Sequence, residues 1–196
     1  MRIISGKAGG IRIEAPPGMN VRPTEDRVKE SLFSTLGDIT GKTVLDLFAG
    51  TGALGLEALS RGAATVHGFE RDRGNCIVIR QNIAAVERNI SGSAKYILHQ
   101  DDAKNAPALL SALSGQFDLV LADPPYDTTE GDYGWRELML DTAIASLLAP
   151  DAILALEHGR EKELPLFPES KWKCIRSKCF GIRCISYCVL VNKEER

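Results

Sequence analysis

The segment from Thr43 to Glu70 constrains the fold more than any other part of the sequence. A short apolar run over residues 43–48 leads into Ala49-Gly50-Thr51-Gly52-Ala53-Leu54-Gly55, whose glycines have the spacing G-x-G-x-x-G. A helical pattern follows over residues 54–61, with Gly62 placed to cap its C-terminus, and a second apolar run ends at Glu70. This order predicts a strand–loop–helix–strand unit whose glycine loop approaches a nucleoside-containing ligand.

Two acidic residues of this unit suggest which ligand it binds. An acid at the end of the second strand, here Glu70, can accept hydrogen bonds from both hydroxyls of a ribose. Nicotinamide dinucleotides and S-adenosylmethionine both contain such a ribose. Asp46 favours S-adenosylmethionine, because a carboxylate attracts ammonium and sulfonium charges and repels a pyrophosphate. The alternative is that Asp46 is a structural acid that ties down the loop by hydrogen bonds.

A second motif, Asp123-Pro124-Pro125-Tyr126, follows a predicted buried strand over residues 116–122. Two prolines cannot continue the strand, so the chain turns at the sheet edge where open α/β sheets bind ligands. Asp123 and a rigid backbone carbonyl can accept hydrogen bonds from the two N–H groups of a planar amine, while Tyr126 stacks on the ring. The alternative is an ordinary turn with a chance pair of prolines.

Three blocks of sequence together resemble one known family. They are Arg22-Pro23-Thr24-Glu25-Asp26-Arg27-Val28-Lys29-Glu30-Ser31-Leu32-Phe33, the Asp46–Gly55 loop and the Asp123–Tyr126 turn, in this order and spacing. The chain is similar, over nearly its whole length, to bacterial methyltransferases of the RsmD type, which modify the N2 amine of a guanine in 16S ribosomal RNA. Enzymes acting on adenine N6 or cytosine N4 share the turn, so residues 22–33 carry the substrate assignment.

The resemblance implies a Rossmann-like, seven-stranded class I methyltransferase fold. It also implies S-adenosylmethionine as methyl donor, S-adenosylhomocysteine as product, and no metal ion. Asp123, Pro124 and Tyr126 are assigned to catalysis, Glu70 to the ribose, Asp102 to the adenine amine, and the Gly50–Gly52 backbone to the methionine part. The candidate cofactor-binding residues are Arg22, Thr24, Asp46, Phe48, Gly50, Thr51, Gly52, Glu70, Arg71, Asp102, Ala103 and Asp123.

The chemistry of an aryl amine explains why such a turn would be needed. The nitrogen lone pair is delocalised into the ring, so the amine is a poor nucleophile until the nitrogen becomes pyramidal. Asp123 and the Pro124 carbonyl can accept hydrogen bonds from its two N–H groups and so favour the pyramidal nitrogen. Because a sulfonium is already activated, the proton can leave after methyl transfer, and a strong base is unnecessary.

Strands and helices alternate along the remaining sequence, which predicts an α/β fold with a mostly parallel sheet. We expect a helix capped by Thr24 and running to Leu36. Further helices are expected over residues 74–87 and 134–148, and strands over 95–100 and 152–157. A C-terminal hairpin over residues 172–175 and 182–191 would add one antiparallel strand. We expect residues 1–20 to form a small N-terminal hairpin extension on a core of residues 21–196, within a single domain of 196 residues.

Charge is unevenly distributed, although the net charge is only −2. Residues 1–29 contain six Arg/Lys and three Asp/Glu, and residues 170–193 contain six Arg/Lys and no Asp/Glu. Residues 30–169, in contrast, contain eleven Arg/Lys and twenty-one Asp/Glu. Basic ends around an acidic middle suit a pocket for a cationic cofactor beside a phosphate-binding surface. The C-terminal cluster can equally be lysines that guard an edge strand. With the resemblance, the RNA-binding candidates are Arg2, Lys7, Arg12 and Tyr126.

Four of the five cysteines lie between residues 174 and 188. Their spacing is not that of a zinc site, and they fall within two predicted strands. We therefore expect small buried thiols in a sheet, and the odd total argues against a disulfide framework.

Three functions from different classes are compatible with these observations. The first is an S-adenosylmethionine-dependent RNA methyltransferase. The second is a nicotinamide-linked oxidoreductase, which leaves the Asp123–Tyr126 turn without a role, and the third is a catalytically silent RNA-binding module. No apolar run approaches the roughly 20 residues that cross a membrane, and the N-terminus is too polar for a signal peptide, so we expect a cytoplasmic protein. The expected partner is 16S ribosomal RNA within an assembled or partly assembled small subunit.

Overall fold

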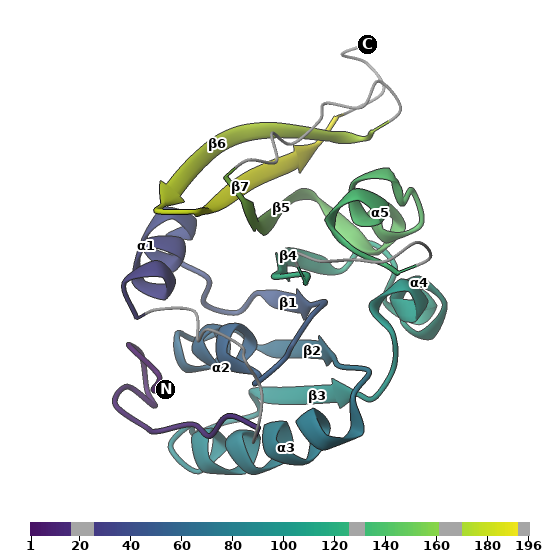
Figure 1. Ribbon diagram of the computed structural model, residues 1–196. Coiled ribbons are helices and arrows are strands. Elements are labelled where there is room, and N and C mark those ends of the chain that lie inside the picture. The colour runs from purple at the N-terminus through teal and green to yellow at the C-terminus, as the bar shows by residue number, and fades with distance from the viewer. Residues whose placement is uncertain (17–25, 126–131, 161–169, 192–196) are drawn as a thin grey trace.

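A seven-stranded sheet forms the centre of the molecule, with the strand order β3-β2-β1-β4-β5-β7-β6. The computed structural model describes residues 1–16, 26–125, 132–160 and 170–191. Strands β1 to β5 are parallel, and β7 runs antiparallel to both of its neighbours. The predicted fold class, a mostly parallel sheet with an antiparallel C-terminal hairpin, is confirmed (Figure 1). The strands are β1 Thr43–Asp46, β2 Thr65–Phe69, β3 Lys95–His99, β4 Phe117–Ala122, β5 Leu148–Gly159, β6 Trp172–Phe180 and β7 Arg183–Leu190.

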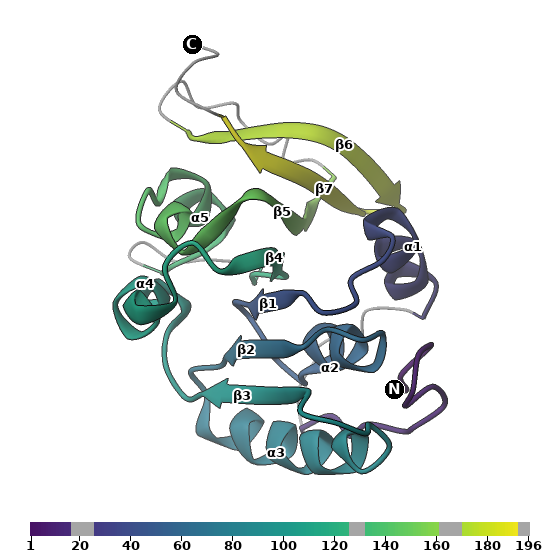
Figure 2. The same ribbon diagram turned by 180° about the vertical axis from the view of Figure 1, so that it is seen from behind.

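The helices cover the two faces of this sheet in two groups (Figures 1 and 2). One group is α1 Asp26–Leu36, α2 Ala53–Ser60 and α3 Arg73–Glu87, and the other is α4 Ala106–Leu109 and α5 Trp135–Leu140. Single 3-10 turns lie at Ala103–Asn105, Ser111–Leu113 and Ile144–Leu147. Among the described helices, none combines the length and apolarity that crossing a bilayer demands.

Each face of the sheet has its own hydrophobic core, because successive side chains of a strand point to opposite faces. On β1, Val44 packs with the α1–α3 group, whereas Leu45 packs with the α4–α5 group. On β4, Leu119 and Val120 divide in the same way. Coverage on both faces explains the nearly continuous apolar runs from which these strands were predicted.

The N-terminal segment folds back on itself as predicted, but through one antiparallel bridge, between Arg2 and Arg12, rather than through two strands. It is also part of the core, since Ile3 and Ile13 are at most 2% exposed. The backbone N–H groups of Ile4 and Ser5 donate to the carboxylate of Glu57 on α2, at 2.7 and 3.1 Å. The segment is therefore integral to the folded domain and not an appended hairpin.

Two other element predictions need correction. The helix expected over residues 134–148 ends at Leu140, because the Asp141 carboxylate accepts a hydrogen bond from the Ala143 N–H (2.7 Å) and starts a separate turn. Strand β5 then begins at Leu148, earlier than predicted. Helix α4 was not predicted, and the proposed Thr24 cap lies outside the described residues.

The prediction for the cysteines is right in part. Cys184 and Cys188 are buried in the sheet, whereas Cys174 is half-buried and Cys179 is exposed. Cys179 and Cys184 face each other directly across the β6–β7 hairpin and form a disulfide. The expectation of free thiols was wrong for this pair, because an odd total excludes only full pairing and not one local cross-strand bond.

Candidate active site

A cavity of about 660 Å³ lies at the carboxyl ends of the parallel strands. The strand order reverses here, between the neighbouring strands β1 and β4. From β1 the chain adds β2 and β3 on one side, and from β4 it adds β5 on the other side. Open α/β sheets bind ligands at such a switch point. The walls come from the segments that follow β1, β2, β3 and β4, the end of β5 and the β6–β7 turn. They include Phe48–Thr51, Glu70–Asp72, Asp101–Ala103, Asp123–Pro125, Tyr133, Glu157, Ile182 and Arg183.

The glycine loop is shaped by backbone conformations that other residues rarely adopt. Gly50 and Gly52 have φ values of 56° and 77°. The third glycine serves packing, because a Cβ on Gly55 would lie 2.6 Å from the Tyr96 ring and 2.8 Å from the Asp46 carboxylate. The loop thus turns tightly at the cavity, and α2 lies close against the sheet behind it.

Asp46 lies behind the glycine loop and is not part of the cavity wall. Its Oδ2 accepts hydrogen bonds from the Gly55 N–H (3.0 Å) and the Tyr96 hydroxyl (3.3 Å). Its Oδ1 is buried and has no hydrogen-bond partner among the described residues. Burial raises the pKa of Asp46 to about 7, against the effect of the Gly55 N–H. This geometry supports the alternative of a structural acid that ties down the loop.

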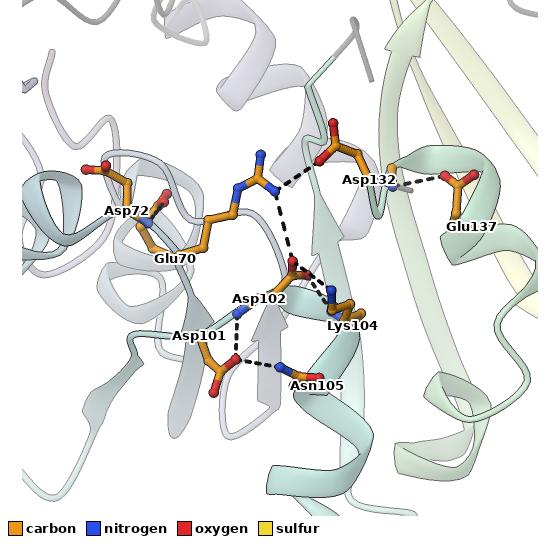
Figure 3. A network of polar contacts seen from close by, with 10 residues as sticks. Glu70, Asp72, Asp101, Asp102, Lys104, Asn105, Asp132 and Glu137 are labelled. Atoms are coloured by element: carbon orange, nitrogen blue, oxygen red, sulfur yellow. Dashed lines mark hydrogen bonds and ion pairs between the residues drawn. The ribbon is translucent and has the colours of Figure 1, made fainter. Parts of the chain in front are cut away.

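Glu70 connects the glycine loop to the start of α3. Its Oε2 accepts from the Gly50 N–H (3.0 Å), and its Oε1 accepts from the Asp72 N–H (2.7 Å). A carboxylate offers about four acceptor sites, so both oxygens retain capacity for a ligand. The backbone therefore holds the Glu70 carboxylate in the cavity wall, beside Asp72 (Figure 3).

Charged side chains approach one another at the cavity wall after β2 and β3 (Figure 3). Arg71 Nη1 lies 3.2 Å from Asp132 Oδ1 and 4.0 Å from Asp102 Oδ2. Asp102 also lies 3.6 Å from the Lys104 ammonium and accepts a hydrogen bond from the Lys104 N–H (3.1 Å). Partly exposed ion pairs of this kind add little stability.

An aromatic pair forms another part of the wall. The rings of Phe48 and Tyr133 are 6.3 Å apart and nearly parallel, at 24°. The Tyr133 hydroxyl donates to Asp141 Oδ2 (2.8 Å), and burial raises the pKa of Tyr133. No sequence motif indicates Tyr133, because it precedes α5 without a recognisable local pattern.

Asp123 lies opposite a second carboxylate that the sequence analysis missed. Ala122 pairs with Leu156, so the next residues in register are Asp123 and Glu157. Glu157 is 3% exposed and accepts a hydrogen bond from Arg183 Nη1 at 3.1 Å. Burial and the charge of Glu157 raise the pKa of Asp123 to about 8, with Arg183 acting in the opposite direction. Glu157 ends a predicted strand as Glu70 does, a signal that was available in the sequence.

The cavity brings most of the predicted site residues together. Those in its wall are Phe48, Gly50, Thr51, Glu70, Arg71, Asp102, Ala103, Asp123 and Pro124. Asp46 and Gly52 are not in the wall, and Arg22, Thr24 and Tyr126 lie outside the described residues. Within the described residues, no group of three or more His, Cys, Asp or Glu side chains is arranged to hold a metal ion.

The RNA-binding candidates separate into two locations. Arg2 and Arg12 line a surface hollow together with Met1, and Met1 also lines the main cavity. Lys7 lies elsewhere, since its backbone N–H donates to Ser60 O (2.8 Å) at the C-terminal end of α2, whose N-terminal end faces the cavity.

Comparison with known proteins places the chain in a family. The family model described as Conserved hypothetical protein 95 matches residues 1–189. The chain belongs to this family. One relative of this family member is "Ribosomal RNA small subunit methyltransferase D" of Escherichia coli (strain K12), 34% identical over 187 residues, which cover 92% of this chain and 85% of that protein. The family indicated by the sequence motifs is thus confirmed.

Solved structures agree with the assignment of this chain to the Conserved hypothetical protein 95 family. A candidate methyltransferase from Escherichia coli, yhhF, matches with a TM-score of 0.77 and 31% identity over 97% of each chain. A candidate methyltransferase complexed with SAH, SMU.776, matches with a TM-score of 0.64 and 12% identity over 83% of this chain and 48% of that one. The second likeness shows the fold alone. The class I methyltransferase fold is confirmed.

Proposed function

We propose that this protein transfers a methyl group from S-adenosylmethionine to the exocyclic N2 amine of a guanine in 16S ribosomal RNA. One observation carries the proposal. A single cavity at the switch point joins the Glu70 carboxylate and the glycine loop at one part of its wall to the Asp123–Pro124 turn at another. The name of the Escherichia coli relative supports small-subunit ribosomal RNA as the substrate.

The cofactor half of the cavity suits S-adenosylmethionine in size and chemistry. The whole cavity, at about 660 Å³, has a volume that is ordinary for a small-molecule or cofactor site. Glu70 has acceptor capacity for a ribose diol, Asp102 is the candidate acceptor for the adenine amine, and the Gly50–Thr51 backbone lies beside the methionine part. When bound, S-adenosylmethionine supplies a methyl group that its sulfonium has already activated.

The other half of the cavity suits an exocyclic amine. Asp123 and the Pro124 carbonyl are proposed to accept hydrogen bonds from the two N–H groups of the amine. These contacts would direct the nitrogen lone pair at the incoming methyl group. Tyr126, next along the chain, is proposed to stack on a base removed from its helix or loop. Because Asp123 accepts best as a carboxylate, we expect the ionised form to be the active one.

The charge of the wall argues against a nicotinamide dinucleotide. The wall contains two basic residues, Arg71 and Arg183, and seven acidic residues, namely Glu70, Asp72, Asp101, Asp102, Asp123, Asp132 and Glu157. A pyrophosphate would meet repulsion there, whereas the cationic S-adenosylmethionine would meet attraction. An adenine N6 or cytosine N4 methyltransferase is the main alternative, since the same turn suits those amines.

The proposed substrate is an assembled or partly assembled small subunit in the cytoplasm. Arg2 and Arg12, which line the hollow beside the cavity, are candidates for phosphate contacts, and local basic patches of this kind should bind free RNA only weakly. A ribosomal RNA loop held open by subunit proteins would present a splayed base, the form that sequence-specific RNA recognition usually needs.

Methyl transfer to small subunits from cells that lack this gene tests the proposal. Purified protein and labelled S-adenosylmethionine should yield N2-methylguanosine at one 16S position after digestion to nucleosides and mass spectrometry. N6-methyladenosine or N4-methylcytosine would replace the proposed base with the alternative. No incorporation, combined with calorimetric binding of NAD and not of S-adenosylmethionine, would overturn methyl transfer itself.

A further inference from the structure

Three charged side chains stand in a row at one end of the cavity. Asp123 follows β4, Glu157 belongs to the end of β5, and Arg183 begins β7. These strands are consecutive neighbours in the sheet, in the order β4-β5-β7. All three residues line the cavity, and Arg183 Nη1 donates to Glu157 Oε1 at 3.1 Å.

The register of the sheet places these side chains on one face. Ala122 pairs with Leu156, which puts Asp123 opposite Glu157. Arg183 pairs with Gly159, and Glu157 lies two residues before Gly159, so both point to the same face. Across the sheet the row therefore presents two negatively charged acceptors, Asp123 and Glu157, followed by a positively charged donor, Arg183.

Guanine carries the complementary groups in the same order. Along its Watson–Crick edge the N2 amine and the N1–H are donors, and O6 is an acceptor. The amines of adenine and cytosine, in contrast, are flanked on this edge by a bare ring nitrogen, N1 or N3, which is an acceptor. A second carboxylate beside the amine-binding acid therefore matches guanine and repels the other two bases.

We propose that Glu157 and Arg183 form a guanine-recognition subsite beside Asp123, with Glu157 accepting from N1–H and Arg183 donating to O6. This inference rests on the proposed function and names the residues that select its base. Glu157 and Arg183 are specificity-determining residues, and Asp123 with Pro124 holds the reacting amine. The Glu157–Arg183 ion pair orients each partner for its own contact with the base.

A substitution in the substrate tests this subsite without altering the protein. 2,6-Diaminopurine retains the reacting 2-amine but has a bare N1 and an amine at position 6, so both neighbouring groups are inverted. Small subunits reconstituted with this base at the target position should be methylated with kcat/KM about 10- to 100-fold below subunits with guanine. Equal values for the two bases would overturn the proposal.

The Glu157→Gln variant tests the assignment of the N1 contact. With its oxygen toward Arg183, the glutamine amide presents N–H to the base, which conflicts with guanine N1–H and suits the bare N1 of diaminopurine. The guanine-to-diaminopurine ratio of kcat/KM should fall about tenfold or more relative to wild type. An equal loss on both bases would identify Glu157 as a structural residue and overturn its part in recognition.

A matched control and a binding measurement complete the design. Asp151→Asn removes an exposed carboxylate at the opposite end of β5 and should leave the ratio unchanged. Calorimetric affinity for S-adenosylmethionine should stay at the wild-type level in Glu157→Gln. If wild type forms no N2-methylguanosine in subunits, the proposed function fails and takes this inference with it. If N2-methylguanosine forms without base discrimination, only this inference fails.

Discussion

Asp123 is partly buried beside a second acid, Glu157, and burial together with the negative charge of Glu157 raises its pKa to about 8. The charged groups that face it are Glu157 from β5, Arg183 from β7 and Asp46 from β1. Below this pKa the acid is largely neutral and accepts the amine N–H poorly. We therefore predict that kcat/KM for methyl transfer rises with pH and levels off above about 8.

The Glu157→Gln variant provides the control for this pH profile. Removing the Glu157 charge removes a cause of the raised pKa of Asp123, so the rise should move to lower pH. Initial rates across the neutral and mildly alkaline range, on one subunit preparation, measure the shift. An unchanged or upward-shifted profile would contradict the assignment of this ionisation to Asp123.

Asp123→Ala should abolish turnover while leaving cofactor affinity nearly unchanged. The acceptor acts on the base, and losing one oriented polar group in a dry site costs roughly 10²- to 10³-fold in rate. Single-turnover rates and calorimetry on the same protein separate the two effects. Activity within a few-fold of wild type would remove the catalytic role of Asp123.

Glu70→Ala should have the reverse effect, weakening S-adenosylmethionine binding first. The variant loses the ribose acceptor, and it also frees the N–H groups of Gly50 and Asp72. Losing charge-assisted hydrogen bonds of this kind weakens binding by about tenfold or more. Calorimetry measures the affinity, with Glu30→Ala, an exposed acid on α1, as the control. Wild-type affinity in Glu70→Ala would refute the ribose assignment.

At the scale of elements, the N-terminal segment and α2 act as one unit. Glu57 is fully buried on α2 and receives Ile4 N–H, Ser5 N–H and the Arg61 guanidinium. Ser60 adds a further link, because its hydroxyl accepts from Ala8 N–H (2.9 Å) and donates to Ser5 O (2.6 Å). Deleting residues 1–14 would therefore disturb the fold, so point substitutions are the better test of RNA contact.

The buried Glu57 leads to a prediction about stability. Glu57→Ala should lower the free energy of unfolding by about 3–5 kcal/mol, because it leaves Arg61 and two partly buried N–H groups without their partner. Denaturant unfolding followed by circular dichroism measures the change. Asp38→Ala, an exposed acid after α1, should change stability by far less. A small effect of Glu57→Ala would mean that the N-terminal segment is only loosely coupled to α2.

At the scale of the whole molecule, basic ends flank an acidic cavity, and the two regions should respond differently to mutation. Replacing both Arg2 and Arg12 with Gln should slow methylation of subunits and reduce the salt dependence of binding, by a slope of about 0.7 to 0.9 per lost phosphate contact. Affinity for S-adenosylmethionine should not change. Lys95→Gln, which removes an exposed cation at the amino end of β3, is the matched control.

Because the proposed RNA contacts are limited to basic patches beside the cavity, we also predict that subunits are better substrates than free RNA. Initial rates on protein-free 16S RNA and on subunits that lack the modification can be compared side by side, with equal target concentrations. Rates on subunits should be higher, because the subunit presents the base in a fixed, open shape. Equal rates would refute the dependence on assembly.

The sequence by itself determined the sheet type, the glycine loop and the Asp123 turn. These depend on local patterns, namely apolar runs, glycine spacing and consecutive prolines, and such patterns act over a few residues. The positions of Phe48, Glu70, Arg71 and Asp102 in one cavity followed from the rule that the carboxyl ends of parallel strands meet at one edge.

Only the tertiary structure showed which residues complete the site and which merely support it. Arg183 reaches Glu157 because β7 inserts between β5 and β6, a strand order that no local pattern encodes. Asp46 is withdrawn from the cavity because α2 packs closely at Gly55, which depends on the whole sheet behind it. Local patterns thus specified the elements and their ends, whereas the partners of each side chain depended on contacts between residues far apart in the chain.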